Sequence, residues 1–150
     1  VQEMLSGVGM LAGERARSRD IHFTIQANGD LGKIIADERR LKQALYSVIS
    51  NGLKFTPPSG SIVLAATRTD GHVEFRVTDT GIGIDREYHA AVFEKFARVS
   101  SQGRSFGMGL GLALVKKLIE LHGGRVELES EPGEGTTITC FVPVDAAKAA

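Results

Sequence analysis

The sequence has little of what marks a secreted, disulfide-rich or membrane-spanning protein. It contains a single cysteine, Cys140, which excludes an internal disulfide and a multi-cysteine zinc site and is typical of a reducing compartment. Its apolar runs all fall short of the about 20 residues that are needed to cross a bilayer. It also shows no pattern typical of a signal peptide. These absences favour a protein of the cytoplasm.

An excess of charge of one sign is missing as well. The 18 Lys and Arg residues balance the 18 Asp and Glu residues, so the formal net charge is 0. This balance argues against nucleic acid or an anionic membrane surface as the main partner. Hydrophobic residues make up 42% of the chain and charged residues 24%, which is ordinary for a globular protein. A length of 150 residues suits one domain with a hydrophobic core.

Hydrophobic periodicity predicts a protein of mixed helices and strands. Apolar residues at helical spacing predict helices over 1–19, after an N-cap at Asp37, and after the glycine run at 107–111. Alternating residues predict strands at 21–25, 33–36, 61–69, 72–78, 125–129 and 136–142. The Asp70-Gly71 pair between two alternating runs predicts a tight antiparallel hairpin. We further expect a short helix at 85–93, a mobile loop at 98–106 and a disordered tail at 146–150.

A carboxylate and two glycines directly follow the strand expected at 72–78. Asp79, Gly81 and Gly83 form a D-x-G-x-G run. Glycine allows a sharp turn and a close backbone approach, which leaves room for a flat ligand. A carboxylate fixed at such a turn can accept a hydrogen bond from a ligand amino group. Alone, the run is also compatible with a simple turn that Asp79 caps.

A second glycine-rich turn, at 107–111, leads into the last predicted helix. Such a turn presents backbone N–H groups and the positive end of the helix dipole, which together favour phosphate. Earlier in the chain, Ser47, Asn51 and Lys54 form a polar stripe on one face of a helix. A carboxamide and an ammonium group so aligned can hold a metal ion and a phosphate, although most polar stripes are solvated helix faces. A nucleotide pocket explains the two turns and the stripe together.

In this order, the blocks resemble the catalytic ATP-binding domain of two-component sensor histidine kinases, within the GHKL ATPase superfamily. The resemblance extends over 21–144. Its motifs are similar to the N box (37–57), the first glycine box (79–83), the F box (93–96), the second glycine box (107–112) and a closing glycine-threonine element (135–137). Each motif is weak alone, and the signal lies in their order over one domain.

The resemblance implies a Bergerat-type α/β two-layer sandwich. One mixed, largely antiparallel sheet would be covered on one face by about three helices, and a mobile ATP lid would extend over 84–106. Residues 1–20 would form a helix that leads from a missing upstream domain, and the ATP-binding catalytic domain would extend over 21–145.

The resemblance also implies a role for individual residues. Asp79 would bind the adenine amino group, and Phe55 would lie near the base. Asn51 would ligate Mg²⁺ and would act in catalysis with Lys54 and Arg98, which approach the phosphates. The implied nucleotide-binding set is Asn51, Lys54, Phe55, Asp79, Gly81, Gly83, Ile84, Phe96, Arg98, Arg104, Gly107, Met108, Gly109, Leu110, Gly111, Leu112 and Thr137. The implied cofactors are ATP and Mg²⁺.

The implied activity is that of an ATP-dependent histidine kinase in a bacterial phosphorelay. The γ-phosphate would pass to a histidine on a separate helical dimerisation and phosphoacceptor domain, and a response regulator would be reached indirectly. The acceptor is expected to lie outside this chain, because His22, His72, His89 and His122 are followed by Phe, Val, Ala and Gly rather than by an acid. No nucleic acid and no direct membrane contact are expected. The domain is expected in the cytoplasm, including as the cytosolic part of a membrane-anchored sensor.

Two positions differ from the family pattern. Ser47 stands where the N box usually has a longer amide or acid, and Met108 stands where the second glycine box usually has a small hydroxyl residue. Both substitutions are compatible with nucleotide binding but remove groups that could serve catalysis. The alternative hypothesis is therefore a degenerate kinase domain that acts as a nucleotide- or partner-binding scaffold. The P-loop, Rossmann and nucleophile-elbow patterns are missing, so other enzyme classes have no support.

Overall fold

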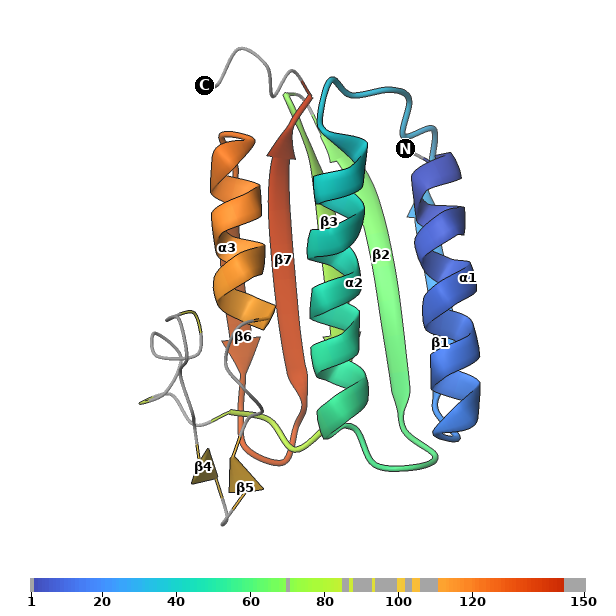
Figure 1. The fold of residues 1–150 in the computed structure, drawn as a ribbon, viewed down its shortest axis with the longest axis vertical. Coiled ribbons are helices and arrows are strands. Elements are labelled where there is room, and N and C mark those ends of the chain that lie inside the picture. The colour runs from blue at the N-terminus through green and yellow to red at the C-terminus, as the bar shows by residue number, and fades with distance from the viewer. Residues whose placement is uncertain are drawn as a thin grey trace.

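The computed structural model describes residues 2–69, 71–84, 87, 93, 100–101, 104–105 and 111–144. Its elements are α1 (Gln2–Ser18), β1 (His22–Asn28), α2 (Glu38–Phe55), β2 (Ser61–Thr69), β3 (His72–Asp79), β4 (Ser100–Ser101), β5 (Arg104–Ser105), α3 (Gly111–Leu121), β6 (Arg125–Ser130) and β7 (Thr136–Pro143). A five-stranded sheet has the order β1-β2-β3-β7-β6, and α1, α2 and α3 lie over one face of it (Figure 1). None of the described helices has both the length and the apolar character that a membrane crossing requires.

Within this sheet, one pair of strands is parallel. β1 runs parallel to β2, whereas the β2–β3, β3–β7 and β6–β7 pairs are antiparallel. The β2–β3 pair is the predicted hairpin, with Thr69 opposite His72. Gly71 supplies the positive φ of 89° in its turn. The predicted fold class, a two-layer sandwich with a mixed and largely antiparallel sheet, is confirmed.

Alternation along the strands gives the sheet a covered face and an open face. In β3, Val73, Phe75 and Val77 are buried beneath the helices, whereas Glu74 and Arg76 lie on the other side. The apolar stripe of α2 packs onto the covered face through Leu41, Ala44, Leu45, Val48, Ile49 and Leu53. The core therefore lies between the helix layer and one face of the sheet.

α1 contributes to this same core. Its apolar residues recur at helical spacing, so they share one side of the helix. The buried ones, which cluster with residues of α2 and the sheet, are Met4, Leu5, Val8, Ala12 and Ala16. The folded unit thus includes a helix that lies before the predicted domain boundary at 21.

His122 connects the end of α3 with the start of α2. Its ring is buried, and its Nε2 accepts a hydrogen bond from the Asp37 N–H at 3.1 Å. The ring proton therefore lies on Nδ1, which donates to the Leu118 carbonyl oxygen at 2.8 Å. Asp37 is the N-cap of α2, as predicted, since its Oδ1 accepts from the Arg40 N–H at 3.2 Å. His122 is a helix-end residue, as expected, and it also joins two helices.

The strand predicted at 33–36 is wrong. Ile35 makes a single bridge, in which its N–H donates to the Val144 carbonyl at 2.9 Å. The Arg68 guanidinium donates to the carbonyls of Leu31 and Lys33 at 2.8 and 3.1 Å. The carbonyl of Lys33, at the start of the predicted strand, is thus bonded by a side chain and not by a neighbouring strand.

The stretch at 98–106, predicted as a mobile loop, contains a short antiparallel pair. β4 and β5 pair through Ser100 with Ser105 and Ser101 with Arg104. Most of the helix predicted at 85–93 and all of the tail at 146–150 lie outside the described residues.

Candidate functional site

Asp79 ends β3 on the covered face of the sheet, and the backbone holds its carboxylate. Its Oδ1 accepts hydrogen bonds from the N–H groups of Gly81, at 2.8 Å, and Thr136, at 3.2 Å. No described residue donates to its Oδ2. Asp79 and Thr136 lie directly opposite each other in the β3–β7 ladder, so their side chains are neighbours on the same face. The carboxylate therefore presents one fixed oxygen and one open oxygen.

Burial changes the ionisation of this carboxylate. Loss of water raises the pKa of Asp79 from 3.8 to about 6, and the hydrogen bonds from Gly81 and Thr136 lower it in part. The folded protein thus disfavours the charged form. At neutral pH, above this pKa, the group is still ionised, and a carboxylate accepts hydrogen bonds without donating any. The site therefore offers a buried acceptor to a ligand.

The turn after Asp79 fits closely against two other segments. The Ile82 N–H donates to the Phe55 carbonyl oxygen at 3.3 Å. A Cβ atom added at Gly81 would lie 2.6 Å from this same oxygen, and one added at Gly83, where φ is +75°, would overlap the Glu131 carbonyl. Both positions need glycine because backbone from another segment fills the space of a side chain.

α2 approaches the carboxylate through Gly52, a residue that the sequence interpretation missed. A Cβ atom at this position would lie 3.4 Å from Asp79 Oδ2. The adjacent Asn51 is half-buried, whereas Lys54 is exposed, with its Nζ 5.9 Å from the centre of the Phe55 ring. The open oxygen of Asp79 thus faces the helix that carries the predicted polar stripe.

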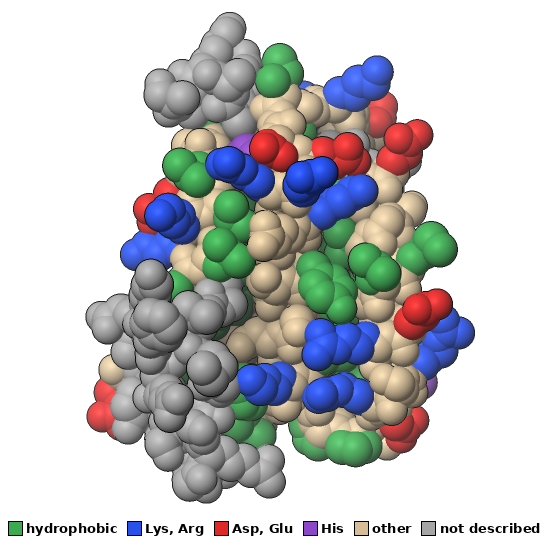
Figure 2. All heavy atoms as spheres, in the orientation of Figure 1, with side chains coloured by type: hydrophobic (Ala, Val, Ile, Leu, Met, Phe, Trp, Pro, Cys, Tyr) green, Lys and Arg blue, Asp and Glu red, His purple; other side chains and the backbone are tan. Residues whose placement is uncertain are grey.

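Positive charge gathers at the same end of the helix layer. Arg15 of α1 donates to Ser50 Oγ at 2.7 Å, and Arg19 donates to the Leu53 carbonyl at 3.2 Å. Figure 2 shows Lys and Arg side chains grouped over this end of the helices, in the lower part of the view. Cationic groups there complement the C-terminal end of the α2 dipole, and they produce a field that favours anions.

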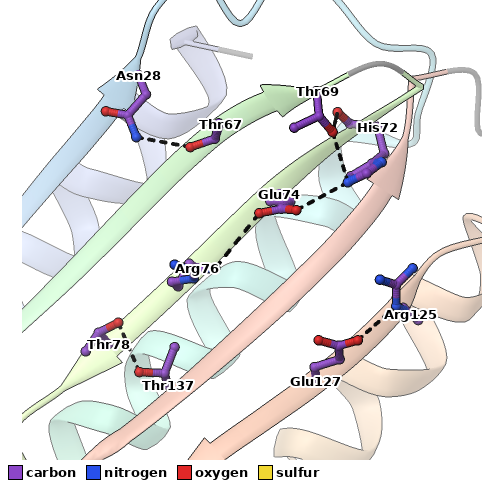
Figure 3. A network of polar contacts seen from close by, with 10 residues as sticks. All are labelled: Asn28, Thr67, Thr69, His72, Glu74, Arg76, Thr78, Arg125, Glu127 and Thr137. Atoms are coloured by element: carbon purple, nitrogen blue, oxygen red, sulfur yellow. Dashed lines mark hydrogen bonds and ion pairs between the residues drawn. The ribbon is translucent and has the colours of Figure 1, made fainter.

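One predicted site residue points away from Asp79. Thr137 lies on the open face of the sheet, where its Oγ1 donates to Thr78 Oγ1 at 3.2 Å (Figure 3). Adjacent residues of a strand point to opposite faces, so Thr136 takes the place beside Asp79. Thr136, and not Thr137, is therefore the threonine that the structure places beside Asp79. The sequence signal that distinguishes the two threonines is the alternation of the strand: Thr136 shares a face with the buried Ile138, and Thr137 lies on the opposite face.

The other predicted residues fall into two groups. Ile84 and Leu112 are buried, Gly111 begins α3, and Arg104 belongs to β5. Those that lie outside the described residues are Phe96, Arg98, Gly107, Met108, Gly109 and Leu110. The structure therefore brings together Asp79, its glycine turn and the helix of the polar stripe.

The open face of the sheet carries a separate polar network (Figure 3). His72 Nε2 lies 3.4 Å from Glu74 Oε1, and Arg76 lies 4.0 Å from the other Glu74 oxygen. On β6, Arg125 pairs with Glu127 at 3.1 Å. These partly exposed ion pairs contribute little to stability. Glu74 and Glu127 each have a basic partner, whereas the hydrogen bonds to Asp79 come from backbone.

The donor groups fit magnesium held jointly with a ligand. In the described parts of the chain, no three His, Cys, Asp or Glu side chains gather into a metal cluster. Mg²⁺ is usually bound by one or two protein oxygens, with water and phosphate oxygens completing its coordination. The half-buried carboxamide of Asn51 can supply one such oxygen.

Comparison with known proteins identifies the family. Residues 36–146 match the HATPase_c model, described as "Histidine kinase-, DNA gyrase B-, and HSP90-like ATPase". The match covers more than half of the chain, and the chain therefore belongs to this family. Its relatives place it among the catalytic ATP-binding domains of sensor histidine kinases.

The relatives are longer signalling proteins. The chain is 42% identical over 144 residues to the sensor protein DivL of Caulobacter vibrioides, which covers 95% of this chain and 18% of DivL. It is 41% identical over 134 residues to the circadian input-output histidine kinase CikA of Synechococcus elongatus, which covers 87% of this chain and 18% of CikA. The chain thus spans under a fifth of these two proteins.

Solved structures of histidine kinases share the fold. Full-length ShkA in complex with AMPPNP matches with a TM-score of 0.83 and 35% identity, over 94% of this chain and 29% of ShkA. The catalytic domain of histidine kinase ThkA matches with a TM-score of 0.84 and 28% identity, over 99% of this chain and 95% of that domain. ThkA in complex with the response regulator TrrA matches with a TM-score of 0.79 and 26% identity, over 99% of this chain and 41% of the matched chain.

Proposed function

We propose that this domain binds Mg-ATP and donates the γ-phosphate to a histidine of a separate dimerisation and phosphoacceptor domain. The observation that carries the proposal is the carboxylate of Asp79, with one oxygen fixed by two N–H groups and the other open beside Gly52. The open oxygen suits the exocyclic amino group of adenine, which is a donor. Family membership supports ATP as the ligand.

The phosphate end of the site is assigned from charge and backbone. Asn51 would hold Mg²⁺, which when bound supplies positive charge to the phosphate oxygens. Lys54, exposed near the end of α2, would approach the same oxygens. The N–H groups of the glycine turn at 107–111, which leads into α3, would donate hydrogen bonds to the phosphate oxygens, and Arg98 and Arg104 would add positive charge.

The chemistry is a phosphoryl transfer. The bond between the γ-phosphorus and the bridging oxygen breaks, ADP leaves with the electron pair, and an imidazole nitrogen of the acceptor forms the new bond to phosphorus. This chain would contribute positioning and charge stabilisation. Ser47 has a hydroxyl group where a carboxylate would be needed as the base that activates water, and this favours transfer to a side chain over rapid hydrolysis.

The partners of this reaction lie outside the chain. The acceptor histidine would belong to a helical domain of the same protein, and a response regulator would then receive the phosphate. The complex of ThkA with the response regulator TrrA supports a response regulator as one of these partners. The reaction would take place in the cytoplasm, where ATP is abundant and the thiol of Cys140 stays reduced.

Calorimetric titration with ATP tests the proposal, with and without Mg²⁺. We expect binding that tightens with Mg²⁺. Asn51→Ala should remove most of the Mg²⁺ dependence while ATP binding persists, because the variant loses a metal ligand and keeps Asp79. Unchanged Mg²⁺ dependence in that variant would contradict the metal assignment, and absence of ATP binding in the parent would contradict the nucleotide site.

Ser47 favours a second candidate function, a degenerate kinase domain that acts as a scaffold. Its half-buried hydroxyl replaces a longer polar group one turn before Asn51. The two functions separate when the domain is mixed with the acceptor domain of its own full-length protein and radiolabelled ATP. Labelled acceptor supports the kinase. Binding of the acceptor domain without label supports the scaffold.

A further inference from the structure

Ser130, the last residue of β6, connects three segments around Asp79 through one buried hydroxyl. Its Oγ accepts a hydrogen bond from the Ile84 N–H at 2.7 Å and donates to the Gly135 carbonyl at 2.8 Å. It also lies 2.9 Å from Thr136 Oγ1. Ile84 belongs to the glycine turn after β3, Gly135 to the turn that enters β7, and Thr136 is the first residue of β7.

The direction of these bonds follows from the chemistry of a hydroxyl group. Such a group has one hydrogen to donate and two lone pairs that accept. The hydrogen of Ser130 goes to Gly135, and one lone pair takes the Ile84 N–H. The contact with Thr136 must therefore use the second lone pair, so Thr136 is the donor. Toward any other group, the oxygen of Thr136 can only accept.

The same turn fixes the carboxylate. The Thr136 N–H donates to Asp79 Oδ1, and the position of that N–H depends on Gly135, whose carbonyl Ser130 holds. A Cβ atom added at Gly135 would overlap the Asp79 carbonyl, which shows how closely this turn lies against the end of β3. Ser130 thus determines both where the Thr136 N–H points and which way the Thr136 hydroxyl is turned.

We propose that Ser130 is a positioning residue that makes the groups around Asp79 accept hydrogen bonds, so that the site selects a base with an amino group. The open oxygen of Asp79 and the oxygen of Thr136 would both present lone pairs. The amino group of a 6-amino purine can donate hydrogen bonds to these oxygens. A 6-oxo purine presents an acceptor there and is rejected. The inference rests on the proposed nucleotide function and adds a residue and a base preference to it.

The test compares ATP with ITP, which differs in having a 6-oxo group in place of the 6-amino group. Calorimetry on the parent should show ATP preferred over ITP. Ser130→Ala should weaken ATP binding about five- to thirty-fold and should affect ITP binding much less. The ratio of ATP affinity to ITP affinity should therefore decrease. Ser130→Thr keeps the hydroxyl and should restore the preference. Thr136→Val keeps the N–H bond to Asp79 but removes the oriented hydroxyl, and it should also narrow the preference.

A second readout needs no nucleotide. Titration of the Asp79 carboxyl by NMR should show a higher pKa in Ser130→Ala, because the loosened Thr136 N–H no longer opposes the effect of burial. Thr139→Ala is the matched control, since Thr139 is buried on β7, the strand of Thr136, with its side chain on the other face of the sheet. It should change stability alone.

The outcomes distinguish the two ideas. A parent that binds no ATP overturns the proposed function, and the NMR titration then decides whether Ser130 positions Asp79. A parent that prefers ATP, with Ser130→Ala showing the same ATP/ITP ratio and the same Asp79 titration, overturns the role of Ser130 and leaves the proposed function standing. The role of Ser130 is supported if Ser130→Ala changes both the ATP/ITP affinity ratio and the pKa of Asp79, and if Ser130→Thr restores both parental values.

Discussion

Two carboxylates on β3, Asp79 and Glu74, lie on opposite faces of the sheet and have different kinds of partner. Glu74 lies on the open face and is paired with His72 and Arg76. Asp79 lies on the covered face, where backbone N–H groups bond one of its oxygens and burial raises its pKa to about 6. The open face satisfies its charge with partly exposed side-chain partners. The covered face keeps a charge that it stabilises poorly, which is the pattern expected where a ligand is to be bound.

Asp79→Asn should have the largest effect, and it should act in opposite directions on stability and binding. The pKa of Asp79 is raised from 3.8 to about 6 on folding, so ionisation costs stability. That cost is absent below the unfolded value, grows between pH 4 and 6, and is complete above pH 6. A shift of about two pKa units corresponds to about 3 kcal/mol. The variant should therefore be more stable than the parent by up to this amount at pH 8, and equal to it near pH 3.5.

Thermal unfolding across this pH range measures the difference. In the same variant, ATP affinity should fall about 100-fold or more, since an amide –NH₂ would face the adenine amino group. Glu74→Gln on the open face is the control for both measurements. A variant that binds ATP as tightly as the parent would show that Asp79 does not contact the base.

His122→Ala should destabilise the domain by about 2 kcal/mol, because it removes one buried and one partly buried hydrogen bond and leaves a cavity. The loss leaves the Asp37 N–H and the Leu118 carbonyl without the ring that bonded them. Urea denaturation gives the change. His22→Ala, at an exposed position of β1, should leave stability within error. Equal midpoints for the two variants would mean that His122 does not hold α2 and α3 together.

Glu74→Gln should have the smallest effect, within about 0.5 kcal/mol, because partly exposed ion pairs are weak. Its pairs with His72 and Arg76 are long, at 3.4 and 4.0 Å. The denaturation midpoint should be unchanged in 0.5 M salt, where surface charges are screened. A loss of stability as large as that of His122→Ala would show that the ion pairs of the open face matter as much to stability as the buried polar contacts.

Local patterns in the sequence predicted most of the fold. The β2–β3 hairpin, the N-cap at Asp37 and the glycine C-terminal signal after α3 each depend on neighbouring residues, so they were readable. The stretch 33–36 makes a single bridge at Ile35 instead of the predicted strand, and the carbonyl of Lys33 at its start is bonded by Arg68, which is distant in sequence. Alternation alone could not reveal that contact.

The candidate site was predicted in outline, with its motifs but not its supporting contacts. Asp79 was identified because a strand runs directly into a glycine turn. The motif indicated Thr137, whereas the pleat of the strand, which the motif does not take into account, places Thr136 beside Asp79. Gly52 and Ser130 were missed because their roles depend on atoms of Asp79, Ile84 and Gly135, which only folding brings near.

The burial of α1 in the core has a consequence for the construction of chimaeric sensors. A fusion joint placed at 21 would separate Leu5, Val8 and Ala12 from the sheet and the helix that they cover. The exchanged module would then expose an apolar surface and lose several kcal/mol of burial. A joint that keeps the whole of Gln2–Ser18 with the sheet transplants a complete folding unit, and the input domain can be varied upstream of it.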